Sequence, residues 1–317
     1  MCIRDSSSRV GLCVSLVAAF FFNGLVANGQ QATKIQDKAD KAEVTSPNDR
    51  FLRIRRDAKG RPIAMETSVV RYQTKNEDGE TVFVDLIGAV HVGQQEYYDS
   101  LNKQFEKYES LLYELVAPEG TVIPKGGRVE NDSIALNPVG GIQKGLKTML
   151  ELEFQLEKID YTKKNFVHAD MTPTEFGKSM EANEESLGGY ALKAMGQSMA
   201  MQASGKDTGT AGMLMAMFSS NKALRLRRVM AQQMINMEAG LVMFEGKDGS
   251  TIINHRNAKC MEVLKRELAS GKKKIAIFYG AGHLADMEKR LISDFQMDVG
   301  GQKWIPAWTL TKRKYEK

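Results

Sequence analysis

The hydrophobic pattern from about residue 51 onward alternates between strand-like and helix-like segments. Met65–Thr74 alternates apolar and polar residues, Thr81–Val90 is apolar and rich in β-branched residues, and turn-forming residues at 76–80 predict a hairpin between them. Leu111–Val116 is predicted to be a buried strand interrupted by one carboxylate, Glu114. Between these strands a helix is expected, with one apolar face made by Tyr97, Tyr98, Leu101, Phe105 and Tyr108.

Helical periodicity dominates the middle of the chain. Gly140–Ile159 is predicted as an amphipathic helix, and Thr172 with Glu175 forms a capping-box pattern at the start of another. A Met-rich helical region spans residues 178–245 and holds 11 of the chain's 18 methionines. These methionines favour flexible core packing, and the alternative is an adaptable lid or groove for apolar peptides or lipids. The remaining elements are expected as a helix near Ala258–Ser270, a strand Lys274–Tyr279, a helix Leu284–Phe295 and a strand near Trp304–Leu310.

This order of elements predicts an α/β fold with a mixed sheet and flanking helices, contained in residues 51–317. Residues 30–50 are polar and predict a flexible linker. Residues 1–29 have the layout of a secretory signal peptide, with Arg4 and Arg9 before an apolar run at 10–26 and small residues at 27–29. We therefore expect cleavage and a periplasmic or secreted protein. The alternative is an uncleaved membrane anchor formed by residues 10–26.

Composition narrows the chemistry that the chain can support. The chain has 44 Lys and Arg against 39 Asp and Glu, and only residues 225–228 form a basic cluster, so no nucleic acid partner is expected. Of three cysteines only Cys260 lies beyond residue 29. A disulfide framework and a cysteine-rich zinc site are therefore excluded from the mature chain.

Two segments repeat one short unit, in which a strand is followed by Gly-Ala-x-His and then by a helix. The units end in Gly88–His91 and Gly280–His283, so two of the four histidines occupy equivalent places. Ligands bind outside the carboxyl ends of strands in α/β sheets, and a glycine before each histidine permits a tight turn. Because imidazole is a common metal ligand, we predict that His91 and His283 bind one metal ion. The alternative is that each is a hydrogen-bonded histidine at a strand end.

These motifs together resemble the TraB/GumN family, which includes the Tiki metalloproteases and the pheromone-shutdown proteins. Family members look like this chain in having an early G-x-x-H, a glutamate ending the next strand, an Arg-Asn pair and a late G-x-x-H. Here they are Gly88–His91, Glu114, Arg256-Asn257 and Gly280–His283, and the resemblance covers residues 65 to 310. The residue before Arg-Asn is often acidic in the family, whereas here it is His255. The resemblance implies a metal-dependent hydrolase of the Tiki type, with an architecture similar to the erythromycin-esterase and ChaN-like groups.

The motif residues have distinct candidate roles. Glu114 is predicted to bind the metal or to activate a metal-bound water as general base, and the alternative is a buried ion pair with Arg256. Arg256 would stabilise an oxyanion or hold a substrate carboxylate, assisted by Asn257 as a hydrogen-bond donor. The alternative for this pair is the exposed start of a helix.

Four further residues are weaker candidates. His168 and Asp170 are either a second ligand pair or part of a capped turn. Asp85, within the first apolar strand, is a candidate for orienting an imidazole. His255 is expected at the surface.

We therefore predict an exported hydrolase that uses water activated by a divalent metal on a peptide or a similar amide or ester. The ligands His91, His283 and Glu114 suit manganese, cobalt, zinc or iron. The chain has no His-Glu-x-x-His helix, Gly-x-Ser-x-Gly elbow or Walker loop, which argues against an ordinary zincin, a serine hydrolase and an NTPase. The rival interpretation is a periplasmic protein that binds haem or a peptide without catalysis, with the histidines as cofactor ligands.

Overall fold

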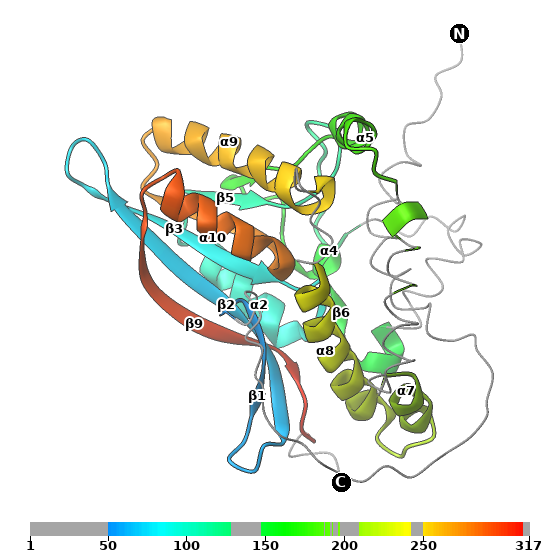
Figure 1. Cartoon of the computed structure of the whole chain (residues 1–317). Coiled ribbons are helices and arrows are strands. Elements are labelled where there is room, and N and C mark those ends of the chain that lie inside the picture. Colours follow the sequence, from blue (N-terminus) through cyan, green and yellow to red (C-terminus); the bar gives the residue numbers. More distant parts are fainter. Residues whose placement is uncertain are drawn as a thin grey trace.

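The protein has a mixed α/β fold in which helices cover both faces of a seven-stranded sheet (Figure 1). The structure is a computed structural model that describes residues 50–127, 147–186, 188–190, 192, 196, 209–241 and 250–312. The predicted signal peptide and all of the predicted linker but Arg50 lie outside these residues. Within the described chain no helix is both long and apolar enough to span a bilayer.

The sheet combines an antiparallel half with a parallel half. Its strands are β1 (Leu52–Arg56), β2 (Pro62–Lys75), β3 (Thr81–Ala89), β5 (Ser110–Tyr113), β7 (Phe166–His168), β8 (Lys274–Gly280) and β9 (Asp298–Thr309). The long strand β2 is antiparallel to β1, β3 and β9. Beyond β3 the neighbours β3, β8, β5 and β7 all run parallel. A short separate ladder joins β4 (Val92–Gly93) to β6 (Glu153–Phe154).

Helices pack on both faces of this sheet, and successive side chains of β8 point to opposite faces. Phe278 faces α2 (Gln95–Phe105), where its ring lies 4.9 Å from that of Phe105. Tyr279, the next residue, points to the opposite face, where its side chain lies close to Cys260 of α9 (Arg256–Ala269) and its hydroxyl donates to the Ala169 carbonyl at 2.5 Å. The other helices are α4 (Gln155–Lys158), α5 (Pro173–Ala182), α7 (Gly209–Met217), α8 (Lys222–Leu241) and α10 (Leu284–Ser293), with short helical turns η5 (Thr251–His255) and η6 (Ala281–His283).

Most elements with a clear hydrophobic pattern form as predicted. β2 and β3 make the hairpin, and α2 buries the apolar face whose tyrosines, leucine and phenylalanine were expected to face inward. The capping box is present, because Thr172 accepts a hydrogen bond from the Glu175 amide at 3.2 Å and its own amide donates to Glu175 at 2.7 Å. α9, β8 and α10 also lie within a few residues of their predicted bounds.

The predicted helix Gly140–Ile159 is wrong in its described part. Residues 147–150 are helical, but Glu151 adopts a positive φ of 53°, and the chain then enters β6 and the short helix α4. Leu150 and Leu152 are both buried, so the apolar positions pack in the core without a continuous helix. The strands β1 and β7 were not predicted, and β9 begins at Asp298 rather than near Trp304.

The Met-rich region is described in part and divides into a packed and an exposed portion. In α8, Leu226, Met230 and Ala231 belong to the main hydrophobic core. In and after α7, Met215 and Phe218 are exposed. The packing interpretation is therefore confirmed for α8, and the apolar surface at α7 needs another explanation.

Candidate functional site

The parallel half of the sheet brings the predicted motifs to one edge. Because β3, β8, β5 and β7 are parallel neighbours, their carboxyl ends lie side by side. Directly after these ends come His91, His283, Glu114 and Asp170. β5 ends at Tyr113 rather than at the predicted Val116, so Glu114 follows the strand instead of interrupting it. This is the edge where α/β sheets bind ligands.

Arg256 is the centre of this cluster. Its Nε donates to Asp170 Oδ1 at 2.9 Å, and its Nη2 donates to Asp170 Oδ2 at 2.5 Å and to Glu114 Oε1 at 2.7 Å. The second oxygen of Glu114 accepts from the Gly280 amide at 2.7 Å. Nη1 makes only long contacts, at 3.5 Å to the Ile252 carbonyl and 3.4 Å to His283 Nε2.

The Arg256–Glu114 ion pair, which was the alternative prediction for Glu114, is therefore present, and Asp170 also pairs with Arg256. Arg256 is 9% exposed and Asn257 is fully buried, so the interpretation of this pair as an exposed helix start is wrong. Arg256 sits at the first position of α9, and the turn η5 before it places its side chain over the carboxyl end of β5.

Burial and charge act in opposite directions on these groups. Burial alone would raise the pKa of Glu114, but Arg256, His283, His91 and the Gly280 amide together hold that pKa well below its usual range. Burial likewise opposes the charge of Arg256, but Asp170 and Glu114 outweigh it and raise the pKa of the guanidinium. With both carboxylates ionised, one positive and two negative charges leave the cluster with one net negative charge. A buried negative excess favours a cationic ligand.

A chain of hydrogen bonds fixes the ring of His283. Its Nδ1 lies 2.7 Å from Asn257 Oδ1, while Asn257 Nδ2 donates to Asp286 Oδ2 at 2.8 Å and to the His283 carbonyl at 3.0 Å. Both partners of Asn257 Nδ2 are acceptors, so the amide oxygen must face the ring and Nδ1 must carry the proton. The unprotonated Nε2 then lies 3.4 Å from Arg256 Nη1, which can donate to it, and 3.5 Å from Glu114 Oε1.

This arrangement predicts a neutral imidazole at physiological pH. Burial lowers the pKa of His283 to about 4, Arg256 acts in the same direction and Glu114 opposes it. Nitrogen-15 NMR of the metal-free protein should therefore show the Nδ1–H tautomer of His283 from pH 7 to pH 5. Because the folded pKa lies below the unfolded value of about 6.5, the stability linked to this ring should fall as pH drops from about 6.5 through 4. A charged ring at pH 6, or the Nε2–H tautomer, would contradict the assignment.

His91 lies at the same edge but is exposed. Its backbone carbonyl accepts from the Gln155 amide at 2.9 Å, and its side chain is near enough to lower the pKa of both Glu114 and His283. The structure thus brings His283 and Glu114 into contact and leaves His91 beside them.

The glycines of the two G-x-x-H units act through close packing rather than through a special backbone conformation. Neither has a positive φ. A Cβ at Gly280 would lie 3.3 Å from Glu114 Oε2, and a Cβ at Gly88 would lie 3.3 Å from the Cβ of Thr67. Glycine is therefore required at both positions because a side chain would crowd its neighbours, and not because the backbone makes the predicted tight turn.

Of the four weaker candidates, Asp170 belongs to the Arg256 cluster and the other three lie elsewhere. His168 Nε2 is 2.6 Å from the Leu115 carbonyl, so it does not form a ligand pair with Asp170. Asp85 pairs with Arg71 at 2.8 Å and with the Tyr108 hydroxyl at 2.6 Å, which places it in the core network of β2, β3 and α2. His255 is half-buried rather than exposed, and its Nδ1 lies 2.9 Å from Ser179 Oγ of α5.

Sequence reasoning missed Asp286, which holds Asn257 in place. Asp286 also accepts from Arg290 Nε at 2.7 Å and from Asn254 Nδ2 at 3.2 Å. Its position three residues after His283, in the first turn of α10, was the available signal.

Two of the three predicted metal ligands have the chemistry and spacing of a metal site. Two atoms bound to one tetrahedral zinc ion at the usual ligand distances lie about 3.4 Å apart, and Glu114 Oε1 and His283 Nε2 are 3.5 Å apart. The hydrogen bond from Nδ1 to Asn257 is the kind that orients metal-binding histidines. Across the described ranges, however, no three His, Cys, Asp or Glu side chains are grouped so that they could hold a metal ion.

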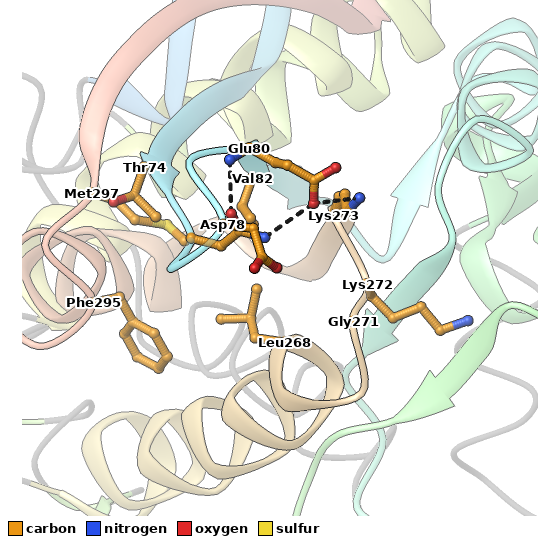
Figure 2. Close-up of a pocket in the computed structure, with 11 residues that line it drawn as sticks. Thr74, Asp78, Glu80, Val82, Leu268, Gly271, Lys272, Lys273, Phe295 and Met297 are labelled. Atoms are coloured by element: carbon orange, nitrogen blue, oxygen red, sulfur yellow. Dashed lines mark hydrogen bonds and ion pairs between the residues drawn. The ribbon is translucent and has the colours of Figure 1, made fainter.

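A surface cavity of about 430 Å³ lies at the opposite, amino end of β8 and holds none of the predicted site residues. Leu268, Phe295 and Met297 form apolar parts of its lining, and Glu80 pairs with Lys273 at 2.6 Å on its rim (Figure 2). It is a shallow surface feature away from the Arg256 cluster.

Comparison with known proteins adds no assignment, because no family model, no curated protein and no solved structure matches the chain.

Proposed function

We propose that this protein is an exported metal-dependent hydrolase of the TraB/GumN type, with the ChaN-like architecture that this resemblance implies. Its substrate would be a peptide or a similar amide or ester, and water would be the nucleophile. The observation that carries the proposal is the 3.5 Å separation of Glu114 Oε1 and the unprotonated Nε2 of His283, inside a largely buried cluster of net negative charge.

The metal would be held by Glu114 and His283, with exposed His91 as the third ligand. A divalent ion there would supply a Lewis acid that lowers the pKa of its bound water. The low pKa of Glu114 makes this carboxylate a weak proton acceptor, which favours the role of ligand over that of general base.

The remaining residues would position these groups and bind charge. Arg256 commits Nε and Nη2 to the two carboxylates, so only Nη1 is available to donate to a developing oxyanion. Asn257, held by Asp286, fixes the His283 ring through Nδ1 and so leaves Nε2 unprotonated beside Glu114 and Arg256. Asn257 would thus be a positioning residue, because its amide is committed to His283 and Asp286.

Metal content of the mature chain, residues 30–317, tests this proposal directly. The protein is purified without chelator, dialysed and analysed by mass spectrometry, and is compared with His91→Ala and His283→Ala. We expect about one transition metal per wild-type chain and a loss in both variants. No retained metal after reloading with manganese, cobalt and zinc would contradict the hydrolase proposal.

A second candidate is a binding protein for haem or a peptide, and the position of α8 favours it. This Met-rich helix contacts η6, the turn that carries His283. The apolar face of α8, which includes Leu226, Met230 and Ala231, could supply the apolar wall of a haem pocket, with His91 or His283 as axial ligand. A Soret band on adding haem to the metal-free protein, without peptide cleavage, would support this candidate against the hydrolase.

A further inference from the structure

Within the described part of the chain, helix α7 has an exposed apolar surface. Its sequence, GTAGMLMAM, contains no charged residue. The inner side packs on α8, where a Cβ at Gly212 would lie 3.2 Å from Val229 Cγ2 and Ala216 is buried. On the outer side and in the following turn, three side chains form what we call the apolar tip: Met215 (72% exposed), Met217 (42%) and Phe218 (89%). A helix with no polar face is normally buried, so this tip needs a partner.

In the sequence on either side of the apolar tip, positive charge predominates. Between Gly188 and Met237 the sequence has six Lys and Arg but a single acidic residue, Asp207. Of these cations, Lys222 and Arg225 follow Phe218 within two helical turns and are exposed. Their charge complements an anionic surface, and the apolar tip complements the hydrocarbon beneath it.

We propose that the α7–α8 hairpin docks on an anionic lipid bilayer, with the apolar tip inserted at the headgroup boundary and Lys222 and Arg225 on the lipid phosphates. Apolar insertion combined with cations at the surface is how interfacial helices bind membranes. Met and Phe side chains suit a fluid boundary because they need no hydrogen-bond partner.

The hairpin is joined firmly to the rest of the molecule. α8 contacts β1 and η6, and Arg228 Nε donates to the Leu310 carbonyl at 2.8 Å. α7 lies on the far side of α8 from the sheet (Figure 1). The apolar tip can therefore enter a bilayer while the sheet stays in water. This proposal is independent of the hydrolase proposal, because it uses none of the site residues.

Co-sedimentation with vesicles tests the proposal. The mature chain, residues 30–317, is mixed with vesicles of phosphatidylglycerol and phosphatidylcholine or of phosphatidylcholine alone, at low and high salt. We expect binding to the anionic vesicles that weakens with salt. Each cation near such a surface contributes roughly a fivefold change in partitioning, so Lys222→Glu with Arg225→Glu should reduce binding by about 25-fold or more. Met215→Ser with Phe218→Ser should reduce it by roughly tenfold or more.

Matched controls carry the same changes on other surfaces. Lys265→Glu with Arg266→Glu reverses two exposed charges on α9, and Ile292→Ser with Val299→Ser removes two exposed apolar side chains. Both controls should bind like the wild type. Absence of wild-type binding, equal binding to pure phosphatidylcholine, or equal loss in the controls would overturn the proposal. So would self-association that is abolished by Met215→Ser with Phe218→Ser in a chain that does not bind vesicles, because a second copy would then cover the tip.

Discussion

Replacing Arg256 with methionine should lower the free energy of unfolding by about 3–5 kcal/mol at pH 7. The guanidinium is the shared partner of Glu114 and Asp170, and its removal leaves two buried carboxylates facing each other without a counter-charge. Urea denaturation of the metal-free protein would measure the change. Among the described pairs that join an arginine or lysine to a carboxylate, only those of Arg256 have all participating side chains at most 13% exposed.

The defect should shrink as the pH falls. In the wild type the pKa of Glu114 is lowered, so its stabilising contribution is present above the unfolded value of about 4.3 and is lost as pH drops below it. In the Arg256→Met protein burial raises the pKa of the same carboxyl, and protonation relieves the penalty. The difference in unfolding free energy between the two proteins should therefore be smaller at pH 4 than at pH 7.

Two comparisons separate this effect from a general loss of packing. Arg61→Met breaks the exposed pair with Asp57, in which the arginine side chain is 69% exposed, and should destabilise the protein far less than Arg256→Met does, because solvent screens this pair. Adding Glu114→Gln and Asp170→Asn to Arg256→Met removes the unpaired charges and should restore part of the stability. A similar cost for Arg256→Met and Arg61→Met would show that the buried cluster contributes little.

The sequence predicted the gathering of motifs because that depends on strand direction. Once strands Thr81–Val90, Leu111–Val116 and Lys274–Tyr279 are placed parallel, the residues after them meet at one edge whatever lies between. The mutual geometry was not predictable from pattern. Asp170 was weighed as a ligand beside His168, but it follows the end of β7, where strand alternation no longer sets side-chain direction, and it turns to Arg256.

Other errors have the same origin in local backbone geometry. The helix expected at Gly140–Ile159 satisfied helical periodicity, which does not reveal the positive φ of Glu151. The glycines of the two G-x-x-H units were expected to allow a turn, but the spacing of backbone and side chains around them could be seen only in three dimensions. Fold class follows from periodicity, whereas the contacts of Asn257 and Asp286 depend on how α9 and α10 pack.

Replacing Glu114 with glutamine should reduce metal-dependent hydrolysis by at least about 100-fold, if the proposed function is correct. Glutamine removes the charge of the proposed metal ligand and leaves a weak neutral oxygen in its place. The fold should be retained, because Arg256 still pairs with Asp170 through two hydrogen bonds and one charge then balances the other. Release of fluorescence from a quenched peptide library, with manganese, cobalt or zinc added, would measure activity, and circular dichroism would check the fold.

Glu175→Gln is the matched control for Glu114→Gln. It makes the same chemical change in the capping box of α5. Because glutamine can also accept the hydrogen bond from the Thr172 amide, activity and stability should stay close to wild type. Because Glu175 pairs with Lys259 at a half-exposed position, loss of its charge is screened by solvent. Equal activity in the Glu114→Gln and Glu175→Gln proteins would show that Glu114 is neither a metal ligand nor a general base in the reaction. If the metal-loaded wild type cleaves no peptide while it retains metal through His91 and His283, the cluster binds a metal without peptidase activity. In that case the net negative charge around Arg256 serves ligand binding alone.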